Sequence, residues 1–149
     1  MSSPQVKLRP ATIDDKAYLY DLARTVYKEL IINQFGEWDE KAQRNKFDRK
    51  WEKASYQIIE MNDRRIGTMW VTVAGDHIRL NEIQIHPEHQ RQGIGSALVS
   101  KQLSIAQKLG IPMRLRLLKG NRAVNFYQRL GFVVGDQTEN YIYMATRKD

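Results

Sequence analysis

The stretch from Leu80 to Leu98 constrains the fold of this chain more than any other. Its first half alternates like a strand, and the strand should stop near His86 because Pro87 cannot donate a hydrogen bond to a sheet. A glycine loop follows, and then a helix predicted from about Gly95 to Lys108, with Gly110 as its stop. The fold must therefore bring a strand end, a glycine loop and a helix start to one point.

The strand and the helix each predict a buried side. Alternation puts three residues on the strand face that we expect to be core: Asn81, Ile83 and Ile85. It puts four on the other face: Leu80, Glu82, Gln84 and His86. Three of these four are polar, which predicts a face that meets water or a polar cleft. The helix carries an apolar stripe: Leu98, Ile105 and Leu109, widened by Val99, Leu103 and Ala106.

The loop has the composition of an anion site. It consists of Gln90, Arg91, Gln92, Gly93, Ile94 and Gly95, followed by Ser96. Backbone N–H groups at a helix start have no partner inside the helix, and the helix dipole there favours anions. Two glycines let the backbone approach a ligand closely, which predicts a phosphate or pyrophosphate cradle. The alternative is a helix entry with flexible glycines. The dinucleotide fingerprint and the P-loop are both absent.

Two blocks of this chain resemble the GNAT superfamily of acyl-CoA-dependent N-acetyltransferases. The motif Gln90-x-x-Gly93-x-Gly95 after a strand is similar to the family signature (Gln/Arg)-x-x-Gly-x-(Gly/Ala). The segment from Asn121 to Phe132 is similar to the late helix of the family, which ends in Tyr-x-x-x-Gly-Phe, and its tyrosine is Tyr127. The blocks have the family's order and roughly its spacing.

The resemblance implies an α/β (α+β) fold, with residues 1–149 forming a single N-acetyltransferase domain. The expected sheet is mixed and mostly antiparallel, with six to seven strands and about four flanking helices. The sequence pattern predicts one strand, two helices, three antiparallel strands, a helix, a strand parallel to the previous one, a helix and two last strands. In the family the fourth and fifth strands splay apart, and the acyl-CoA arm enters the gap.

Periodicity and turn residues predict the remaining elements. A strand over Val6–Arg9 precedes a helix from Asp14 or Asp15, as its cap, to about Leu30. A second helix covers about Glu40–Lys53, and a hairpin turns at Asn62-Asp63. The hairpin strands and the later elements are Tyr56–Met61, Arg65–Ala74, the strand Met113–Leu117, a helix from Gly120 or Asn121 to Gly131, and the strands Phe132–Val134 and Tyr141–Ala145.

The chain contains no cysteine, which excludes a thiol acyl-enzyme and favours direct attack of an amine on the thioester. Glu82 is the candidate base, because an amine of pKa about 10.4 needs help to lose its proton at neutral pH. Its alternative roles are binding the acceptor's ammonium or satisfying a buried neighbour. Tyr127 is the candidate general acid for the leaving thiol, and the alternative is a tyrosine packed in the core.

The resemblance also implies contacts with acetyl-CoA, the expected acyl donor. The backbone of Ile83, Gln84 and Ile85 should pair with the pantetheine amides, and one N–H group should polarise the thioester carbonyl. In the family an asparagine usually lies seven residues before the late-helix tyrosine, but this position is Gly120. Asn121, displaced by one, either replaces it or caps the helix; Asn125 is a further alternative.

The net charge of +7 favours anionic ligands, coenzyme A among them. We expect the basic side chains of the second helix to be solvated: Lys41, Arg44, Lys46, Arg49, Lys50 and Lys53. Two other classes remain open, a basic nucleic-acid-binding module and an acyl-CoA sensor without turnover. Helix-turn-helix, aromatic-platform and zinc patterns are lacking, so nucleic acid is a disfavoured partner.

The acceptor is expected to be a primary amine, on a small molecule or a protein. Aromatic residues with neighbouring acids could line its site, or could form an ordinary loop with a core tryptophan: Phe35, Trp38 and Trp51, with Glu37, Asp39 and Glu40. His86 and His89 lack a third ligand, so no metal site is expected. The sequence has no run of 18 apolar residues and no cysteine, which predicts a cytoplasmic protein with no membrane partner. A homodimer is left open.

Overall fold

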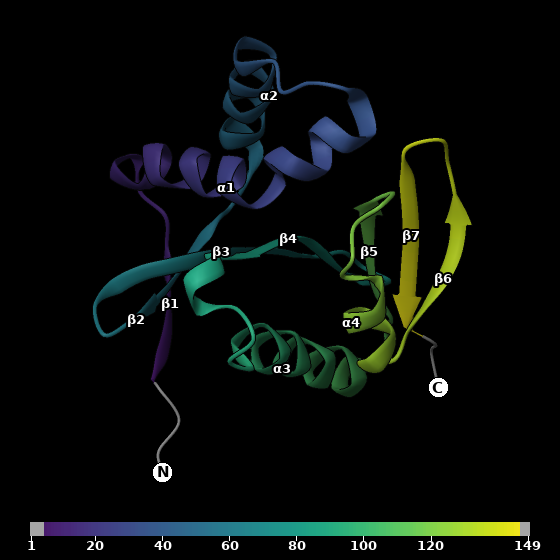
Figure 1. Cartoon of the computed structure of the whole chain (residues 1–149). Coiled ribbons are helices and arrows are strands. Elements are labelled where there is room, and N and C mark those ends of the chain that lie inside the picture. The colour runs from purple at the N-terminus through teal and green to yellow at the C-terminus, as the bar shows by residue number, and fades with distance from the viewer. Residues whose placement is uncertain (1–4, 147–149) are drawn as a thin grey trace. The chain divides into compact units, whose positions relative to one another are not determined.

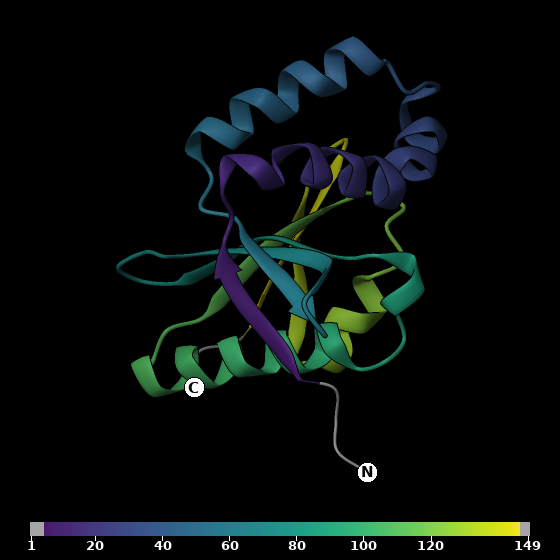
Figure 2. The ribbon, with the colours of Figure 1, turned by 90° about the vertical axis from the view of Figure 1, so that its left-hand side faces the viewer.

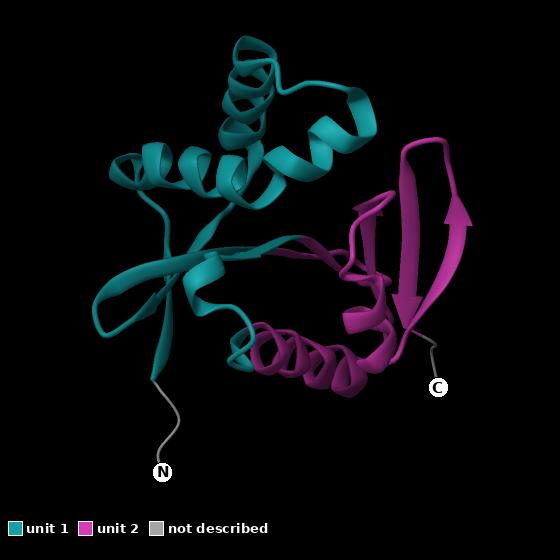
Figure 3. Cartoon of the chain, in the orientation of Figure 1, with its two compact units in different colours: residues 1–70, 82–94 teal, residues 71–81, 95–149 magenta. Residues whose placement is uncertain are grey.

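The computed structural model describes residues 5–146, which form two compact units (Figure 3). Unit 1 comprises the residues up to Trp70 together with Glu82–Ile94, and unit 2 comprises Val71–Asn81 and the residues from Gly95 onward. The strands follow the order β1-β2-β3-β4-β5-β7-β6 in a seven-stranded mixed sheet, and the described residues contain four α-helices. This confirms the predicted fold class and element order.

The sheet of unit 1 contains three antiparallel strands, β1 (Val6–Pro10), β2 (Gln57–Met61) and the first part of β3 (Arg64–Val73), together with the end of β4. The predicted turn between β2 and β3 is confirmed, since Asn62 and Asp63 have φ angles of 54° and 61°. Positive φ at both central residues gives a turn whose twist matches that of the paired strands. Helices α1 (Lys16–Phe35) and α2 (Glu40–Lys53) lie on the same side of these strands (Figures 1 and 2).

Aromatic rings form the core between the helices of unit 1 and β2. The buried cluster contains Leu19, Tyr20, Phe47, Tyr56 and Ile58. Phe47 stacks on Trp51 and on Tyr56, each with a centroid distance of 6.4 Å, and meets Tyr20 edge-on at 5.5 Å. These contacts fix which side of α2 faces inward, because Phe47 and Trp51 are one helical turn apart.

A buried carboxylate joins β1 to the start of α1. Asp15 accepts a hydrogen bond from Arg9 Nη1 at 2.7 Å, one from Arg65 Nη1 at 3.3 Å and one from the Thr12 backbone N–H at 2.8 Å. The hydrogen bond from Arg9 holds the pKa of the Asp15 carboxyl well below its ordinary value, despite the opposing effect of burial. Asp15 is the N-cap residue of α1, as predicted, but its side chain makes no capping hydrogen bond to that helix and instead stabilises the turn Ile13–Asp15.

Unit 2 contains the start of β4 (Ile78–Ile85), with β5 (Met113–Leu118), β6 (Phe132–Gln137) and β7 (Tyr141–Thr146). The predicted parallel pair is present, since Ile78 lies opposite Met113 and Arg79 opposite Arg114. On its other edge β5 pairs antiparallel with β7, which pairs antiparallel with β6. The splay of β4 from β5 beyond these residues stays a prediction. Helices α3 (Ile94–Leu109) and α4 (Val124–Arg129) lie next to each other in Figure 1.

Two helix boundaries were wrong. Helix α1 continues five residues beyond the predicted end to Phe35, because no helix breaker occurs before Gly36, which takes the left-handed φ of 92° that ends the helix. Helix α4 begins at Val124 rather than at Gly120 or Asn121. There Asn121 Oδ1 accepts a hydrogen bond from the Ala123 N–H at 2.9 Å, so a side-chain-closed turn precedes the helix.

The predicted faces of β4 and α3 also need correction. In β4 the buried residues are Ile78, Leu80 and Gln84, whereas Asn81, Ile83 and Ile85, our expected core face, are only partly buried. The polar residue Gln84 is buried rather than exposed, because a hydrogen-bonded amide can be buried. In α3 the stripe centres on Val99 and Ala106, which are buried, while Ile105 and Leu109 are 40% and 56% exposed.

Candidate active site

The Glu82 carboxylate is the centre of a polar cluster in unit 1. Gln84 Nε2 donates to Glu82 Oε1 at 2.9 Å, and the Tyr27 hydroxyl donates to Oε2 at a longer 3.4 Å. The Lys50 ammonium lies 3.7 Å from Oε1. The Glu82 side chain is 15% exposed, so water still reaches it. Residues from β4, α1 and α2 thus converge on one carboxylate, including the predicted site residues Glu82 and Gln84.

Two buried polar groups surround this carboxylate. Burial, with a further contribution from the Glu82 charge, raises the pKa of Tyr56, so its phenol stays neutral across the physiological range. Gln84 is 4% exposed, and its Oε1 has no hydrogen-bond partner among the described residues. A buried acceptor without a partner costs free energy.

The backbone of β4 at this point lies directly against β3. A β-carbon placed on Gly67 would collide with the backbone carbonyl of Gln84, so only glycine fits there. Next to it, the His86 N–H donates to the Ile66 carbonyl at 2.8 Å. This close approach fixes the distance between β3 and the segment of β4 that carries Glu82 and Gln84. An isolated glycine inside a strand pattern, as at Gly67, is the sequence signal for such a close approach.

Hydrogen bonds from side chains shape the loop between β4 and α3. Gln90 Nε2 donates to the Ile85 carbonyl at 2.8 Å, and His86 Nδ1 accepts from the Glu88 N–H at 3.2 Å. Arg91 and Gly93 have φ angles of 63° and 79°. The Gln90 side chain therefore closes the loop. The other predicted cradle residues follow it into the first turn of α3: Arg91, Gln92, Gly93, Ile94, Gly95 and Ser96.

The surroundings of Gly93 fit an anion. No described heavy atom lies within 4 Å of a β-carbon placed on Gly93. Helix α3, which begins at the next residue, has 16 residues and a full dipole. An open backbone position in front of a long helix is the geometry in which N–H groups bind phosphate oxygens.

Tyr127 lies in unit 2, in a small aromatic cluster at the end of α4. Its ring is buried and meets Phe126 at 5.0 Å and Phe132 at 5.5 Å, both edge-on. The side chain of Phe126 in turn lies 3.8 Å from a β-carbon placed on Gly95 at the start of α3. The ring therefore packs in the core of unit 2, and its role in chemistry stays a prediction. The same holds for Asn121, whose Oδ1 is engaged by the turn before α4.

Several residues that we considered for the acceptor have local structural partners. Asp39 Oδ1 accepts from the Ala42 N–H at 3.0 Å and so caps α2. Glu40 accepts from Trp38 Nε1 at 2.8 Å and from the Tyr20 hydroxyl at 2.9 Å. These contacts favour the interpretation of this segment as a structured loop.

The cluster around Glu82 contains two residues that sequence reasoning missed. Tyr27 lies in α1, for which we predicted no site residue, and Lys50 belongs to a basic face of α2 that we expected to be solvated. The other members of that face are exposed as predicted, including Arg44, whose guanidinium carbon lies 4.0 Å from the centre of the Tyr20 ring. Within the part of the chain that the structure describes, no group of three or more potential ligands could hold a metal ion.

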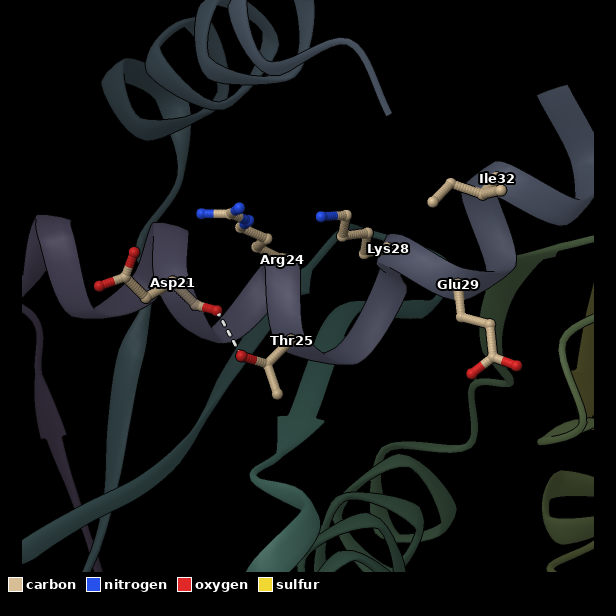
Figure 4. A pocket seen from close by; sticks show the side chains of 6 residues that line it. All are labelled: Asp21, Arg24, Thr25, Lys28, Glu29 and Ile32. Carbon is tan, nitrogen blue, oxygen red and sulfur yellow. Dashed lines mark hydrogen bonds between the residues drawn. The ribbon is translucent and has the colours of Figure 1, made fainter. Parts of the chain in front are cut away.

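A hollow of about 590 Å³ lies along one face of α1 (Figure 4). The side chains that line it are Asp21, Arg24, Thr25, Lys28, Glu29 and Ile32. Thr25 Oγ1 donates to the Asp21 carbonyl at 2.9 Å, and Arg24 Nε lies 3.9 Å from Glu40 Oε2. Both charge signs occur in the hollow, and none of its residues is a predicted site residue.

Comparison with known proteins identifies similar sequences and folds. Residues 52–134 match the sequence profile of the acetyltransferase (GNAT) domain. An uncharacterised N-acetyltransferase of Methanocaldococcus jannaschii is 25% identical over 107 residues, covering 66% of this chain and 47% of that protein, so this match spans about half of its length. The uncharacterised protein YyaT of Bacillus subtilis is 24% identical over 74% of this chain and 70% of its own.

A solved structure shares the fold over nearly the whole chain. The PaiA N-acetyltransferase of Thermoplasma acidophilum, crystallised with coenzyme A, has a TM-score of 0.75 at 21% identity and covers 96% of this chain and 99% of its own. Across residues 5–146, no helix is both long and apolar enough to span a membrane.

Proposed function

This chain belongs to the GNAT family of acetyltransferases, and from that premise we propose that it transfers an acetyl group from acetyl-CoA to a primary amine. In this proposal residues 1–149 act as one N-acetyltransferase domain in the cytoplasm. The coenzyme A bound to the T. acidophilum N-acetyltransferase supports acetyl-CoA as the donor. The net charge of +7 favours the same anionic cosubstrate.

The observation that carries the amine proposal is the contact between Lys50 and Glu82. A primary ammonium lies 3.7 Å from the Glu82 carboxylate, which is largely shielded from water. An acceptor amine has the same chemistry as the Lys50 side chain and can take its place at the carboxylate. The unpartnered Gln84 Oε1 offers such an amine a second hydrogen-bond acceptor.

In the proposed reaction the acceptor nitrogen gives a proton to Glu82, directly or through water, and attacks the thioester carbonyl. The carbon–nitrogen bond forms, the carbon–sulfur bond breaks, and the sulfur leaves as a thiol with a proton from Tyr127. The nitrogen loses its second proton to water, and the Tyr127 phenolate takes a proton back from water. Backbone groups of Ile83–Ile85 polarise the carbonyl and pair with the pantetheine amides. The loop from Gln90 to Ser96 holds the pyrophosphate through backbone N–H groups.

The position of Asn121 limits how it can contribute. Its Oδ1 already accepts from the Ala123 N–H, so we propose that any contact with acetyl-CoA uses the side-chain amide nitrogen. The contact would then be a donated hydrogen bond, which suits a carbonyl or phosphate oxygen of the cosubstrate.

Turnover of acetyl-CoA against a panel of primary amines tests the proposed function. Release of free thiol should depend on the amine, and mass spectrometry should find the acetylated product. Saturable acetyl-CoA binding with no thiol release for any amine would favour a sensor without turnover. Salt-dependent DNA binding without acetyl-CoA affinity would favour the nucleic-acid module instead.

A further inference from the structure

Three arginines lie side by side on one face of the sheet in unit 2. Arg79 of β4 pairs with Arg114 of β5, and Arg116 follows two residues later on the same strand. Arg116 in turn pairs with Tyr143 of β7. Because directly paired residues and alternate residues of a strand share a face, these side chains all project from the same side of the sheet. We call this surface, with Tyr141, the arginine face.

The arginine face is the uncovered side of this part of the sheet. The opposite face carries Met113, Leu115 and Met144, all buried. Val133 pairs with Ala145, so its neighbour Phe132 lies on that opposite face. The Phe132 ring packs against Tyr127 of α4. Helix α4 therefore covers the apolar face, whereas all three arginines are exposed and Tyr143 is 36% exposed.

The arginines of this face are not neutralised by ion pairs in the part of the chain that the structure describes. None of the three arginines forms an ion pair with a described carboxylate. Arg114 contributes to lowering the pKa of the Asp76 carboxyl, but the hydrogen bond of Asp76, at 2.7 Å, goes to His77. Like charges directly opposite each other destabilise a sheet, so this arrangement costs free energy in the isolated chain.

We propose that the arginine face binds an extended acidic segment of another polypeptide. A guanidinium binds a carboxylate through two parallel hydrogen bonds, which explains arginine in place of lysine at these positions. Arg114 and Arg116 are two residues apart on a strand, a repeat of about 6.6–6.8 Å. Carboxylates at alternate positions of an extended peptide have the same repeat, so successive acids can meet successive arginines.

The aromatic residues of the face argue against single-stranded nucleic acid as the occupant. Such binding uses open aromatic rings on which successive bases stack. The guanidinium of Arg116 lies 4.1 Å above the ring of Tyr141, so one of its two π-faces is already covered. This leaves Tyr143 as the more open ring of the face, which is a small platform for stacking.

Fluorescence anisotropy with a labelled peptide of alternating glutamate and threonine tests the proposal. The probe should bind at low salt, weaken as salt is added, and bind much more tightly than the matching glutamine–threonine peptide. The double variant Arg114→Gln, Arg116→Gln should weaken binding by about tenfold or more. The control, Arg49→Gln with Arg64→Gln, removes two exposed arginines of unit 1 and should leave affinity within about twofold of wild type.

Three results would overturn the proposal: equal binding of the glutamate and glutamine peptides, an equal loss in the control variant, or tighter binding of a single-stranded oligonucleotide than of the acidic peptide. Circular dichroism should show that both double variants fold. If the Arg114, Arg116 variant does not fold, Arg79→Gln alone should still weaken binding of the glutamate peptide, and unchanged affinity in that variant counts against the proposal. Binding is measured without acetyl-CoA, so the outcome is independent of the acetyl-transfer assay.

Discussion

Gly67 of β3 lies so close to the backbone carbonyl of Gln84 in β4 that no side chain fits between them. The contact matters for chemistry because Gln84 Nε2 holds the Glu82 carboxylate at 2.9 Å. A residue on one strand thus fixes the position of the candidate base on the next, without touching it.

Replacing Gly67 with alanine should therefore damage both stability and activity. The added methyl group forces the two backbones apart, and overpacking of this kind typically costs about 1–3 kcal/mol. We expect a lower Tm and a loss of acetyl transfer larger than the loss of acetyl-CoA affinity, because Glu82 moves with its strand.

Gly75→Ala provides the matched control. Gly75 is exposed, and a β-carbon placed there meets no described atom within 4 Å. Its Tm and kcat should stay near wild type. A Gly67→Ala protein that behaves like the control would show that the strands separate without cost.

Gly93→Asp should abolish tight binding of acetyl-CoA with little effect on folding. The carboxylate would occupy the position at the N-terminus of α3 where we propose that phosphate oxygens bind. Its negative charge would also repel the phosphates of acetyl-CoA. Calorimetric titration of acetyl-CoA, with a thermal melt of the same sample, measures both quantities.

Gly93→Asn separates charge from shape in this experiment. Asparagine is nearly isosteric with aspartate and tolerates a positive φ such as the 79° of Gly93. It should lose less affinity than the aspartate variant. Equal losses would mean that bulk alone disturbs the loop, and undiminished binding in both variants would refute the cradle.

The sequence predicted most elements because their signals are local. The Asn62-Asp63 turn and the bounds of α2 depend on neighbouring residues, and both agree with the structure. The faces of β4 were wrong for a physical reason. Alternation treats polar residues as exposed, whereas Gln84 is buried through hydrogen bonding and close backbone contact.

The candidate site was only partly predictable, since its contacts join distant parts of the chain. Glu82 stood out as a carboxylate inside a strand. Its partner Tyr27 lies 55 residues away, and Lys50 was one of several basic residues on a helix face. No local pattern distinguishes the lysine whose ammonium lies near Glu82, because the packing of Phe47 and Trp51 decides how α2 is oriented.

Asp15→Asn should destabilise the protein at neutral pH by about 2 kcal/mol, through weakened hydrogen bonds with Arg9 and Arg65. The lowered pKa of Asp15 means that its stabilising effect is present above the unfolded-state pKa of about 3.9 and is lost as the pH falls below it. The difference in free energy of unfolding between wild type and variant, the stability gap, should therefore become smaller at acidic pH. Urea unfolding at about pH 7 and at the lowest pH that preserves the fold measures it. The exposed neighbour Asp14→Asn is the control, and a gap that is constant with pH would contradict the assignment.

Glu82→Gln should reduce kcat/KM by about 10²-fold at neutral pH if Glu82 is the base. The defect should shrink as the pH approaches the amine pKa of about 10.4, because free amine then needs no base. A defect of the same size at every pH would instead indicate that Glu82 binds the acceptor ammonium. Glu52→Gln, an exposed carboxylate change on α2, should leave the pH profile unchanged.

Tyr127→Phe separates chemistry from binding, because it removes a single oxygen from a ring whose packing it preserves. The ring contacts Phe126 and Phe132 edge-on at 5.0 and 5.5 Å, and phenylalanine can keep both contacts. Stability should therefore change little. If the hydroxyl protonates the leaving thiol, kcat should fall by roughly tenfold or more. This is below the usual 10²–10⁴-fold for general acid catalysis, because a thiol of pKa about 8.5 leaves tolerably as a thiolate.

The accompanying measurement is the dissociation constant of acetyl-CoA on the same Tyr127→Phe protein. It should change by less than about tenfold, or 1.4 kcal/mol, since the proposed acid acts after the cosubstrate is bound. Tyr143→Phe removes an exposed hydroxyl from β7 and should leave kcat near wild type. Because protonation by an acid helps a poorer leaving group more, the Tyr127→Phe defect should also grow for acyl thioesters whose thiols have a higher pKa. A variant that keeps its kcat but loses acetyl-CoA affinity would make Tyr127 a binding or packing residue, and the thiolate would then leave without an acid.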